Sequence, residues 1–270
     1  MNRHFNDLLP DIVNAINYNY TQSDLLLGKS DKYLPVRSTI IDILDDLKRL
    51  MFPGYFSTDR VDVTNASYYT GQILSSLHLK LRKQIALALA YDREPGIFSS
   101  NPDIIAEAEN ICCNFFESVP HIQEMLLLDV QAGYDGDPAA DNKEQIIFSY
   151  PGFYATFVYR IAHELYKMKV PFIPRVMTEH AHGKTGIDIN SGATIGKYFF
   201  MDHGTGIVIG ETTIIGDYVK LYQGVTLGAL STRGGQHLAG VKRHPTIEDR
   251  VTIYSNATVL GGETIIGADS

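Results

Sequence analysis

Residues 209–228 read IGETTIIGDYVKLYQGVTLG, and the six-residue spacing of aliphatic residues in this stretch decides the fold. The repeated aliphatic positions here are Ile209, Ile215, Leu221 and Leu227, and a second run on the same spacing comprises Ile247, Ile253 and Val259. A period this short is typical of a β-helix, in which each hexapeptide forms one side of a triangular coil and points its aliphatic residue into the core. The sequence from residue 187 to the end therefore predicts a parallel β-helix.

The first interruption of this spacing contains a histidine. Ile209 follows Met201 by eight positions instead of six, so two additional residues lie between Asp202 and Val208. Because a stack of such repeats buries a continuous core and leaves its turns free, residues that interrupt the repeat are candidates for function. His203, inside this interruption, is one such candidate.

A second interruption, residues 229–242, has no six-residue spacing and is rich in glycine. This composition predicts a loop that projects from the β-helix before Pro245 resumes the repeat. Arg243 and His244 lie at the end of this loop. A polar residue at a turn is often merely solvated, but two interruptions that each carry a histidine favour a functional site.

The first 185 residues have helical rather than six-residue spacing. Apolar residues recur three or four positions apart in three segments, which include Leu8, Ile12, Val13 and Ile16; Ile40, Ile43, Leu44 and Leu47; and Ile73, Leu77, Leu81 and Ile85. Four further helices are predicted over residues 104–118, 121–132, 152–169 and 174–182, with Pro120 separating the first two. The expected fold class is α+β, with an all-helical domain over residues 1–185 followed by a β-helix domain over residues 186–270.

Composition and charge exclude several classes of partner. The 270 residues include 31 acidic and 23 basic side chains, and the net charge of -8 disfavours nucleic acid. No stretch approaches the roughly 20 apolar residues of a membrane span, and residues 1–5 lack the apolar segment of a signal peptide. A cytoplasmic location is therefore expected. The only cysteines, Cys112 and Cys113, are adjacent, which favours reduced helical residues over a disulfide or a metal site.

Four phrases of the chain carry a resemblance to a known family: TGIDI at residues 185–189, DHGTGIVIGET at 202–212, VTLG at 225–228 and RHP at 243–245. In wording and order they resemble the serine O-acetyltransferases, which transfer the acetyl group of acetyl-CoA to the hydroxyl of L-serine in the first step of cysteine biosynthesis. The resemblance covers about residues 130–267 and is weaker over the first hundred residues.

The resemblance implies an assembly as well as an activity. Members of the family have a helical N-terminal domain and a left-handed β-helix that forms a homotrimer, with active sites between neighbouring subunits. Whether two trimers pair through their helical domains stays open. L-Cysteine, the end product of the pathway, is expected to inhibit at the serine site because its thiol is nearly isosteric with the serine hydroxyl.

The resemblance places the catalytic pair of the family on His203 and Asp188. The chemistry agrees, because a serine hydroxyl is a poor nucleophile at neutral pH and a neutral imidazole must take its proton. A carboxylate behind the ring then fixes its tautomer and stabilises the imidazolium that forms. The two residues are 15 positions apart, close to the roughly 18 of one three-sided coil, so one circuit of the β-helix can bring them together.

Four residues are assigned to the serine substrate by the resemblance. Arg243 and His244 are expected to hold the substrate carboxylate, while Asp137 and Asp202 receive its ammonium group. Charge supports this division, since an arginine binds a carboxylate in bidentate fashion through its planar fork. On spacing alone, Asp137 would be part of a turn whose side chains satisfy local backbone amides.

The residues that bind acetyl-CoA, the expected co-substrate, are less clearly indicated than those that bind serine. Related enzymes lay its pantetheine arm along the groove between adjacent β-helices, and Gly228, Ala229 and Ser255 occupy the matching positions. Small side chains at coil turns are explained equally well by β-helix packing. No metal ion is expected in the reaction.

The chain departs from the family pattern at three places. Tyr154 stands where many members have histidine, and Asn190 replaces the histidine of the usual Asp-Ile-His-Pro phrase. The sequence stops at residues 268–270 in mid-repeat, where a relative would continue with another coil and a flexible tail. That tail often binds O-acetylserine sulfhydrylase, so this partner is expected only for a chain with a longer C-terminus.

Three other functions are compatible with a hexapeptide β-helix. An O-acetyltransferase acting on a sugar or another small-molecule hydroxyl would have less need of Arg243 and Asp202. A γ-type carbonic anhydrase would need three histidines on zinc, for which His203, His237 and His244 are the available set. A non-catalytic scaffold would be favoured only if Asp188 or His203 were misplaced.

Overall fold

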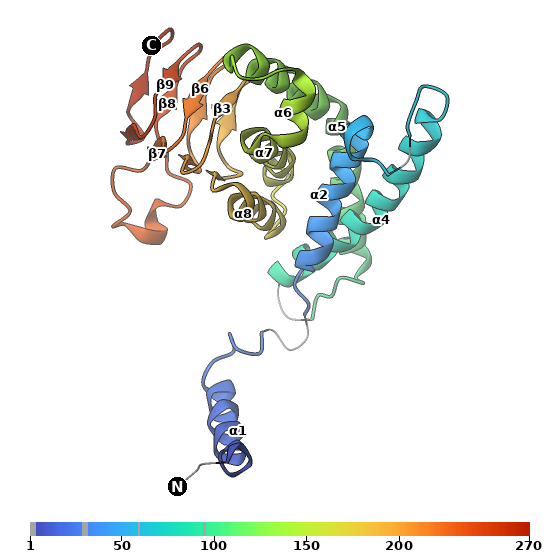
Figure 1. Cartoon of the computed structure of the whole chain (residues 1–270). Coiled ribbons are helices and arrows are strands. Elements are labelled where there is room, and N and C mark those ends of the chain that lie inside the picture. Colours follow the sequence, from blue (N-terminus) through green and yellow to red (C-terminus); the bar gives the residue numbers. More distant parts are fainter. Residues whose placement is uncertain (1–3, 29–31, 59, 94–95) are drawn as a thin grey trace.

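The computed structural model describes residues 4–28, 32–58, 60–93 and 96–270 (Figure 1). Residues 1–3, which form part of the N-terminal segment considered above, lie outside this range. The helices of the described chain are α1 (Phe5–Gln22), α2 (Arg37–Met51), α3 (Pro53–Phe56), α4 (Ala66–Asp92), α5 (Pro102–Gly136), α6 (Lys143–Ser149), α7 (Pro151–Lys167) and α8 (Ile173–Thr185). Short parallel strands follow in three sheets, so the expected α+β class is confirmed.

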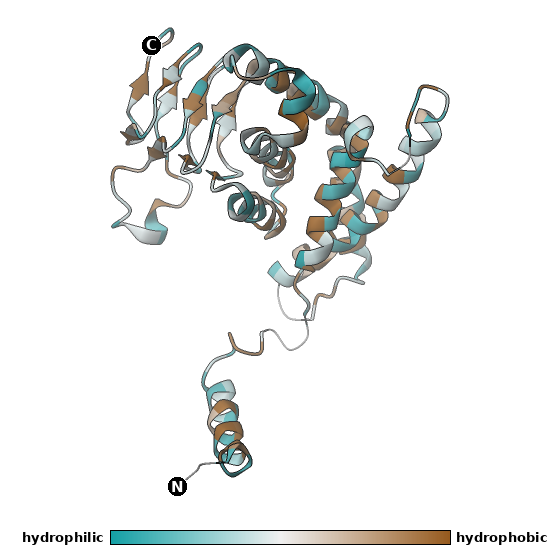
Figure 2. Cartoon of the chain, in the orientation of Figure 1, coloured by the Kyte–Doolittle hydropathy of each residue, from teal (hydrophilic) through white to brown (hydrophobic). Residues whose placement is uncertain are grey.

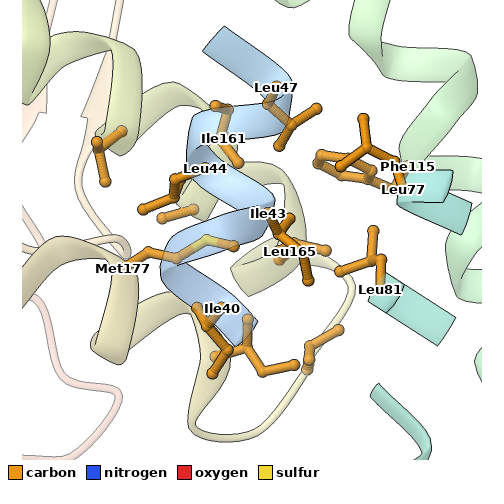
Figure 3. Packing of buried hydrophobic residues seen from close by; sticks show 14 of the residues in the cluster. Ile40, Ile43, Leu44, Leu47, Leu77, Leu81, Phe115, Ile161, Leu165 and Met177 are labelled. Carbon is orange, nitrogen blue, oxygen red and sulfur yellow. The ribbon is translucent and has the colours of Figure 1, made fainter. Parts of the chain in front are cut away.

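Helix α2 forms the centre of the helical core. Its apolar stripe, Ile40, Ile43, Leu44 and Leu47, is at most 1% exposed. Figure 3 shows Leu77 of α4 on one side of α2 and Met177 of α8 on the other. Burial of such a stripe, rather than helix propensity, supplies most of the stability of a helix in a protein.

Helix α5 differs from the expectation. Two helices separated by Pro120 were predicted, but one helix of 35 residues runs through this proline. A proline inside a helix costs roughly 3 kcal/mol. A continuous buried stripe, Phe115, Val119, Ile122 and Leu126, crosses the position of the proline and packs into the core. We attribute the continuity of α5 to this burial, which offsets the lost hydrogen bond. Both cysteines lie unpaired in this helix, as expected.

The β-helix has three parallel sheets, one for each side of the coil. The first contains β1 (Asp188–Ile189), β4 (Val208–Ile209), β7 (Thr226–Gly228) and β10 (Thr258–Leu260); the second contains β2 (Thr194–Ile195), β5 (Ile214–Ile215), β8 (Thr246–Ile247) and β11 (Ile265–Ile266); the third contains β3 (Phe200–Asp202), β6 (Lys220–Tyr222) and β9 (Thr252–Ile253). The repeated aliphatic residues stack directly, as Ile209 on Leu227 and Leu221 on Ile253. The predicted core positions are confirmed.

The turns of the coil differ in length where the sequence is interrupted. Asp188 pairs with Val208, twenty positions later, whereas Val208 pairs with Thr226 after eighteen. The two additional residues lie in the segment that contains His203. Figure 1 shows the second interruption as a loop that projects between β7 and β8, with one 3-10 turn at Gly235–Leu238.

A buried ion pair joins the helical part to the first coil. Arg160 of α7 contacts Asp129 of α5 through two hydrogen bonds of 2.5 and 2.8 Å. The same guanidinium donates to the Gly196 carbonyl at 2.8 Å, and the Phe199 amide donates to Asp129 at 3.0 Å. These bonds satisfy both charges, and they fix α5 and α7 against the β-helix.

Replacing Arg160 by methionine is expected to lower the free energy of unfolding by about 3 kcal/mol or more, because Asp129 would remain as a buried, unpaired charge. Chemical denaturation measures this change. Arg175→Met is the matched control, since Arg175 pairs with Glu179 at the surface, where both side chains are more than 40% exposed, and such pairs contribute at most about 1 kcal/mol. Equal losses in the two variants would contradict the structural role of Arg160.

Helix α1 lies apart from the other helices (Figure 1) and contains no buried residue. Leu9, Ile12, Val13 and Ile16 are each more than 40% exposed, while Leu8 is half-buried. Figure 2 shows apolar residues along this helix. Among the described helices, none combines the length and the apolar content needed to cross a bilayer.

Candidate active site

His203 lies in a tight turn at the corner between the third sheet and the first. The chain leaves β3 at Asp202 and passes through positive φ at His203 (58°), Gly204 (84°) and Gly206 (82°). A Cβ atom on Gly204 would lie 2.5 Å from Ile187. The turn holds the imidazole outward, with the side chain 73% exposed. Non-glycine residues with positive φ are uncommon, and histidine, asparagine and aspartate tolerate them best.

Asp188 belongs to the same corner. The amide of Gly206 donates to the Gly186 carbonyl at 2.8 Å, and the amide of Asp188 donates to the Ile207 carbonyl at 2.9 Å. The turn that carries His203 is therefore bonded to the segment that begins β1. No ion pair joins Asp188 to His203 in the described part of the chain; Nδ1 of His203 instead lies 3.7 Å from Oδ1 of Asp202.

The two aspartates expected to bind an ammonium group have different surroundings. Asp137 accepts hydrogen bonds from the Tyr150 hydroxyl at 2.7 Å and from the Ala139 amide at 2.9 Å. The bond from Tyr150 is the main cause that lowers the pKa of Asp137, and the charges of Lys220 and His203 act in the same direction. Asp137 is therefore ionised at neutral pH and lies within electrostatic reach of His203.

Asp202 is buried and paired with a lysine. The Lys220 ammonium lies 3.0 Å from Oδ2 of Asp202 and donates to the Gly136 carbonyl at 2.6 Å. Burial alone would lower the pKa of Lys220, but its contacts with Tyr222 and Asp202 raise it. Lys220 is therefore a permanent positive charge between the segment that carries Asp137 and the segment that carries Asp202.

Sequence reasoning did not select Tyr150 or Lys220. The hexapeptide register contained a signal for Lys220: β6 pairs with β3, and the residues on either side of Leu221 point outward beside those that flank Met201. No comparable signal existed for Tyr150. It reaches Asp137 because α5 and α7 pack side by side, which the local sequence does not specify.

Arg243 and His244 lie at a different corner, between the first sheet and the second. Both backbone amides donate to the Thr212 hydroxyl, at 2.9 and 3.1 Å, and the Arg243 side chain pairs with Glu211. The His244 ring lies over Gly210, where a Cβ atom would come within 2.0 Å of it. Only glycine fits under this ring.

The protonation of His244 follows from its contacts. Burial is the main cause that lowers its pKa, and the neighbouring Arg243 adds to the effect. The Thr212 amide donates to Nδ1 at 3.1 Å, so Nδ1 is an acceptor and the proton of the neutral ring is assigned to Nε2. A neutral His244 can therefore donate a hydrogen bond from Nε2 to a ligand.

The predicted site residues thus divide between two corners of the β-helix. Asp137, Asp188, Asp202 and His203 gather at the corner after β3, while Arg243 and His244 lie at the corner before β8. Because these are separate corners of the same triangular prism, one chain does not bring the two sets together.

The residues expected to bind acetyl-CoA follow the same division. Gly228 ends β7 and Ala229 follows it, at the corner that carries Arg243. Ser255 is exposed just after β9, at the corner that carries His203. Each corner therefore holds part of the expected serine site and part of the expected coenzyme site.

One group that could hold a metal ion is found in the described chain, and it includes the predicted catalytic residue Asp188. Glu179, His182 and Asp188 offer ligand atoms that all lie within 4.8 Å of one another. This group does not include His203, His237 or His244, the set that a zinc-dependent carbonic anhydrase would need. His237 lies in the projecting loop.

Comparisons with known proteins were made for the sequence and for the fold. No protein-family model matches the chain. The chain is 41% identical over 243 residues to the plasmid serine acetyltransferase of Synechococcus elongatus, an alignment that covers 87% of this chain and 76% of the relative.

Two solved structures extend the comparison to the fold. Serine acetyltransferase isoform 3 of Entamoeba histolytica, in complex with cysteine, has a TM-score of 0.71 at 33% identity and covers 98% of this chain and 85% of its own. Serine acetyltransferase of Neisseria gonorrhoeae, in complex with serine, has a TM-score of 0.51 at 26% identity and covers 82% and 84%. The identity and the coverage together place this chain in the serine acetyltransferase family.

Proposed function

We propose that this enzyme transfers the acetyl group of acetyl-CoA to the hydroxyl of L-serine, which yields O-acetyl-L-serine and CoA in the first step of cysteine biosynthesis. The observation that carries the proposal is the corner after β3, where the exposed imidazole of His203 lies beside the carboxylates of Asp137 and Asp202. A base next to two carboxylates fits a substrate that presents a hydroxyl and an ammonium group.

In the proposed reaction, neutral His203 removes the proton from the serine hydroxyl as its oxygen attacks the thioester carbonyl. The tetrahedral intermediate then collapses, the bond from carbon to sulfur breaks, and the imidazolium returns the proton to the departing thiolate of CoA. Asp188 orients the ring and stabilises its charged form. The turn that carries His203 is bonded to the start of β1, which supports this role for Asp188.

The substrate carboxylate requires the second corner, and we infer that a neighbouring subunit supplies it. Arg243 and His244 of one chain would face His203 of the next across a cyclic homotrimer, in which each interface is built from two different surfaces. Acetyl-CoA would lie in the same groove, with Gly228 and Ala229 from one chain and Ser255 from the other. Pairing of two trimers through the helical domains remains compatible with the exposed apolar stripe of α1.

We further propose that residues 186–270 form the catalytic domain, and that residues 1–185 contribute Asp137 and the contacts for oligomerisation. A cytoplasmic location fits a biosynthetic enzyme of this kind. O-acetylserine sulfhydrylase is proposed as a partner only for a chain that has a longer C-terminal tail. An acceptor sugar is less favoured, because Arg243 and the two aspartates match the two charges of an amino acid.

Thiol release from acetyl-CoA, followed with a thiol-reactive dye, tests the proposed reaction directly. Release is expected with L-serine and not without an acceptor. Glycerol offers hydroxyl groups without the two charges and should be a poor acceptor. Thiol release with neutral hydroxyl compounds but not with L-serine would mean that the enzyme is an O-acetyltransferase for another acceptor.

L-Cysteine is expected to inhibit competitively with serine, because its carboxylate and ammonium groups can use the same contacts. The cysteine complex of the Entamoeba histolytica relative supports this expectation. Initial rates at several serine concentrations measure it. 3-Mercaptopropionate, which keeps the thiol and the carboxylate but lacks the ammonium group, should inhibit much less. Inhibition that serine does not relieve would place cysteine outside this site.

Replacing Tyr150 by phenylalanine is expected to raise the KM for serine roughly fivefold with little change in kcat, since one hydrogen bond to a charged group is lost. The sign of the pH effect follows from Asp137: its pKa is lowered mainly by this bond, so the pKa rises in the variant and the ionised form is lost at higher pH. Serine KM should therefore increase more steeply in the variant as the pH falls.

Tyr198→Phe is the matched control for this variant. The Tyr198 hydroxyl donates to the carboxylate of Asp135, which is a bond of the same kind outside the proposed site. Steady-state kinetics from pH 4, close to the ordinary pKa of an aspartate, to pH 8 should leave this control close to the parent. A serine KM unchanged in Tyr150→Phe would remove Asp137 from the ammonium site.

A further inference from the structure

A cavity lies in the helical part, and Tyr150, which bonds Asp137 of the proposed serine site, is among its lining residues. It has a volume of about 290 Å³ and is bounded by α2, α3, α6, α7 and α8. Its walls are largely aromatic: Phe52 and Phe153 meet edge to face at 5.6 Å, and Phe56 and Phe148 stack at 6.0 Å. The volume and the apolar lining are those of a site for a small molecule with one ring.

The polar groups of this cavity converge on Tyr154. The Tyr154 hydroxyl is buried and has no hydrogen-bond partner. The Lys184 ammonium lies 5.4 Å from the centre of its ring and the Lys48 ammonium lies 5.9 Å from it. Buried hydroxyl groups in folded proteins nearly always have a partner, so the unpartnered one marks a position where a ligand can accept a hydrogen bond.

The charge of the cavity selects an anion. Lys48 is balanced by Asp45, whose carboxylate lies 3.3 Å from its ammonium. Lys184 forms no ion pair with any carboxylate in the described ranges, although it lines the cavity. One positive charge therefore remains to be balanced beside the ring of Tyr154.

We propose that this cavity binds a small aromatic monocarboxylate, with its ring among the phenylalanine side chains and its carboxylate between Lys184 and the Tyr154 hydroxyl. Tyr150 connects the cavity to the serine site, because it lines the cavity while its hydroxyl donates to Asp137. A bound acid therefore alters the position of Tyr150 and, through it, the affinity for serine. This consequence rests on the proposed function, whereas the binding itself does not.

A tryptophan reporter makes the binding measurable. The chain contains no tryptophan, and Phe148 is 68% exposed at the mouth of the cavity, so Phe148→Trp introduces a single fluorophore there. Titration with 3-phenylpropionate should give a saturable change in emission. 3-Phenylpropan-1-ol, which has the ring without the charge, and propionate, which has the charge without the ring, should each bind at least about fivefold more weakly. Saturation-transfer NMR on the unsubstituted chain repeats the measurement without the reporter.

Two variants in the reporter background test the polar contacts. Lys184→Met and Tyr154→Phe should each weaken 3-phenylpropionate about three- to tenfold, while Lys167→Met, a matched loss of charge on α7 outside the cavity, should not. Thermal unfolding checks that each variant is folded. In the unsubstituted enzyme the acid should also change the KM for serine, and this change should disappear in Lys184→Met.

The outcomes separate the cavity from the activity. Absence of saturable binding in both measurements overturns the proposed site. This result is expected if an apolar side chain of a second copy of the chain fills the cavity. Equal affinity for the acid and the alcohol, or an unchanged affinity in Lys184→Met, overturns the assignment of an anion. Binding without any change in serine KM overturns the connection through Tyr150. If 3-phenylpropionate binds but the enzyme shows no serine-dependent turnover, the result would count against the proposed function and not against the cavity site.

Discussion

Replacing His203 by asparagine is expected to lower kcat by about 10²- to 10⁴-fold, the usual contribution of a general base. The protein should remain folded, because the His203 side chain is 73% exposed and forms no part of the core. Asparagine is preferable to alanine here, since φ at this position is 58° and asparagine tolerates positive φ better than most residues. Thiol release at saturating serine and acetyl-CoA measures the loss.

His237→Asn is the matched control for this variant. His237 lies in the projecting loop between β7 and β8 and is exposed. It should keep nearly full turnover, and the two variants should unfold at similar temperatures. Full activity in His203→Asn would remove this residue as the base. Activity that is lost together with the fold in His203→Asn, but not in the control, would assign it a structural role instead.

Most of the β-helix could be predicted because a single repeat length, six residues, governs it. When an aliphatic residue recurs every six positions, each repeat forms one side of the coil and the vertical pairing follows, as in Ile209 above Leu227 and Leu221 above Ile253. The two additional residues around His203 were also visible, because any insertion breaks this phase. The six-residue spacing also places Arg243 just before a strand of the second sheet.

The helical part was less predictable because its contacts are between segments that are distant in sequence. Pro120 signals the end of a helix locally, and only the buried stripe of α5 explains why the helix continues. Asp129 and Arg160 are 31 positions apart and meet through packing. Tyr150 reaches Asp137 for the same reason, so the local sequence did not reveal it.

The division of the site between two corners leads to an expected rescue. His203→Asn alone and Arg243→Met alone should each have little activity. In the first the base is missing from every interface, and in the second the group that holds the substrate carboxylate is missing. Loss of such a charged partner typically costs about 2–5 kcal/mol. If the two residues of each site come from different chains, a mixed oligomer contains some interfaces in which both are intact.

Each interface of a cyclic trimer takes one side from each of two neighbours, so every trimer that contains both variants has one intact interface out of three. Trimers that contain both variants should therefore recover roughly one third of the parental activity. The variants are co-expressed with different affinity tags, and oligomers that carry both tags are isolated before thiol release is measured. The reference is a mixture of the double variant and unsubstituted chains in equal amounts. Its activity shows what is expected when chains exchange freely between oligomers. Mixed oligomers of confirmed composition with no activity above the single variants would mean that His203 and Arg243 act within one chain. That result would contradict the structure directly, since the corner after β3 and the corner before β8 are separate corners of the β-helix.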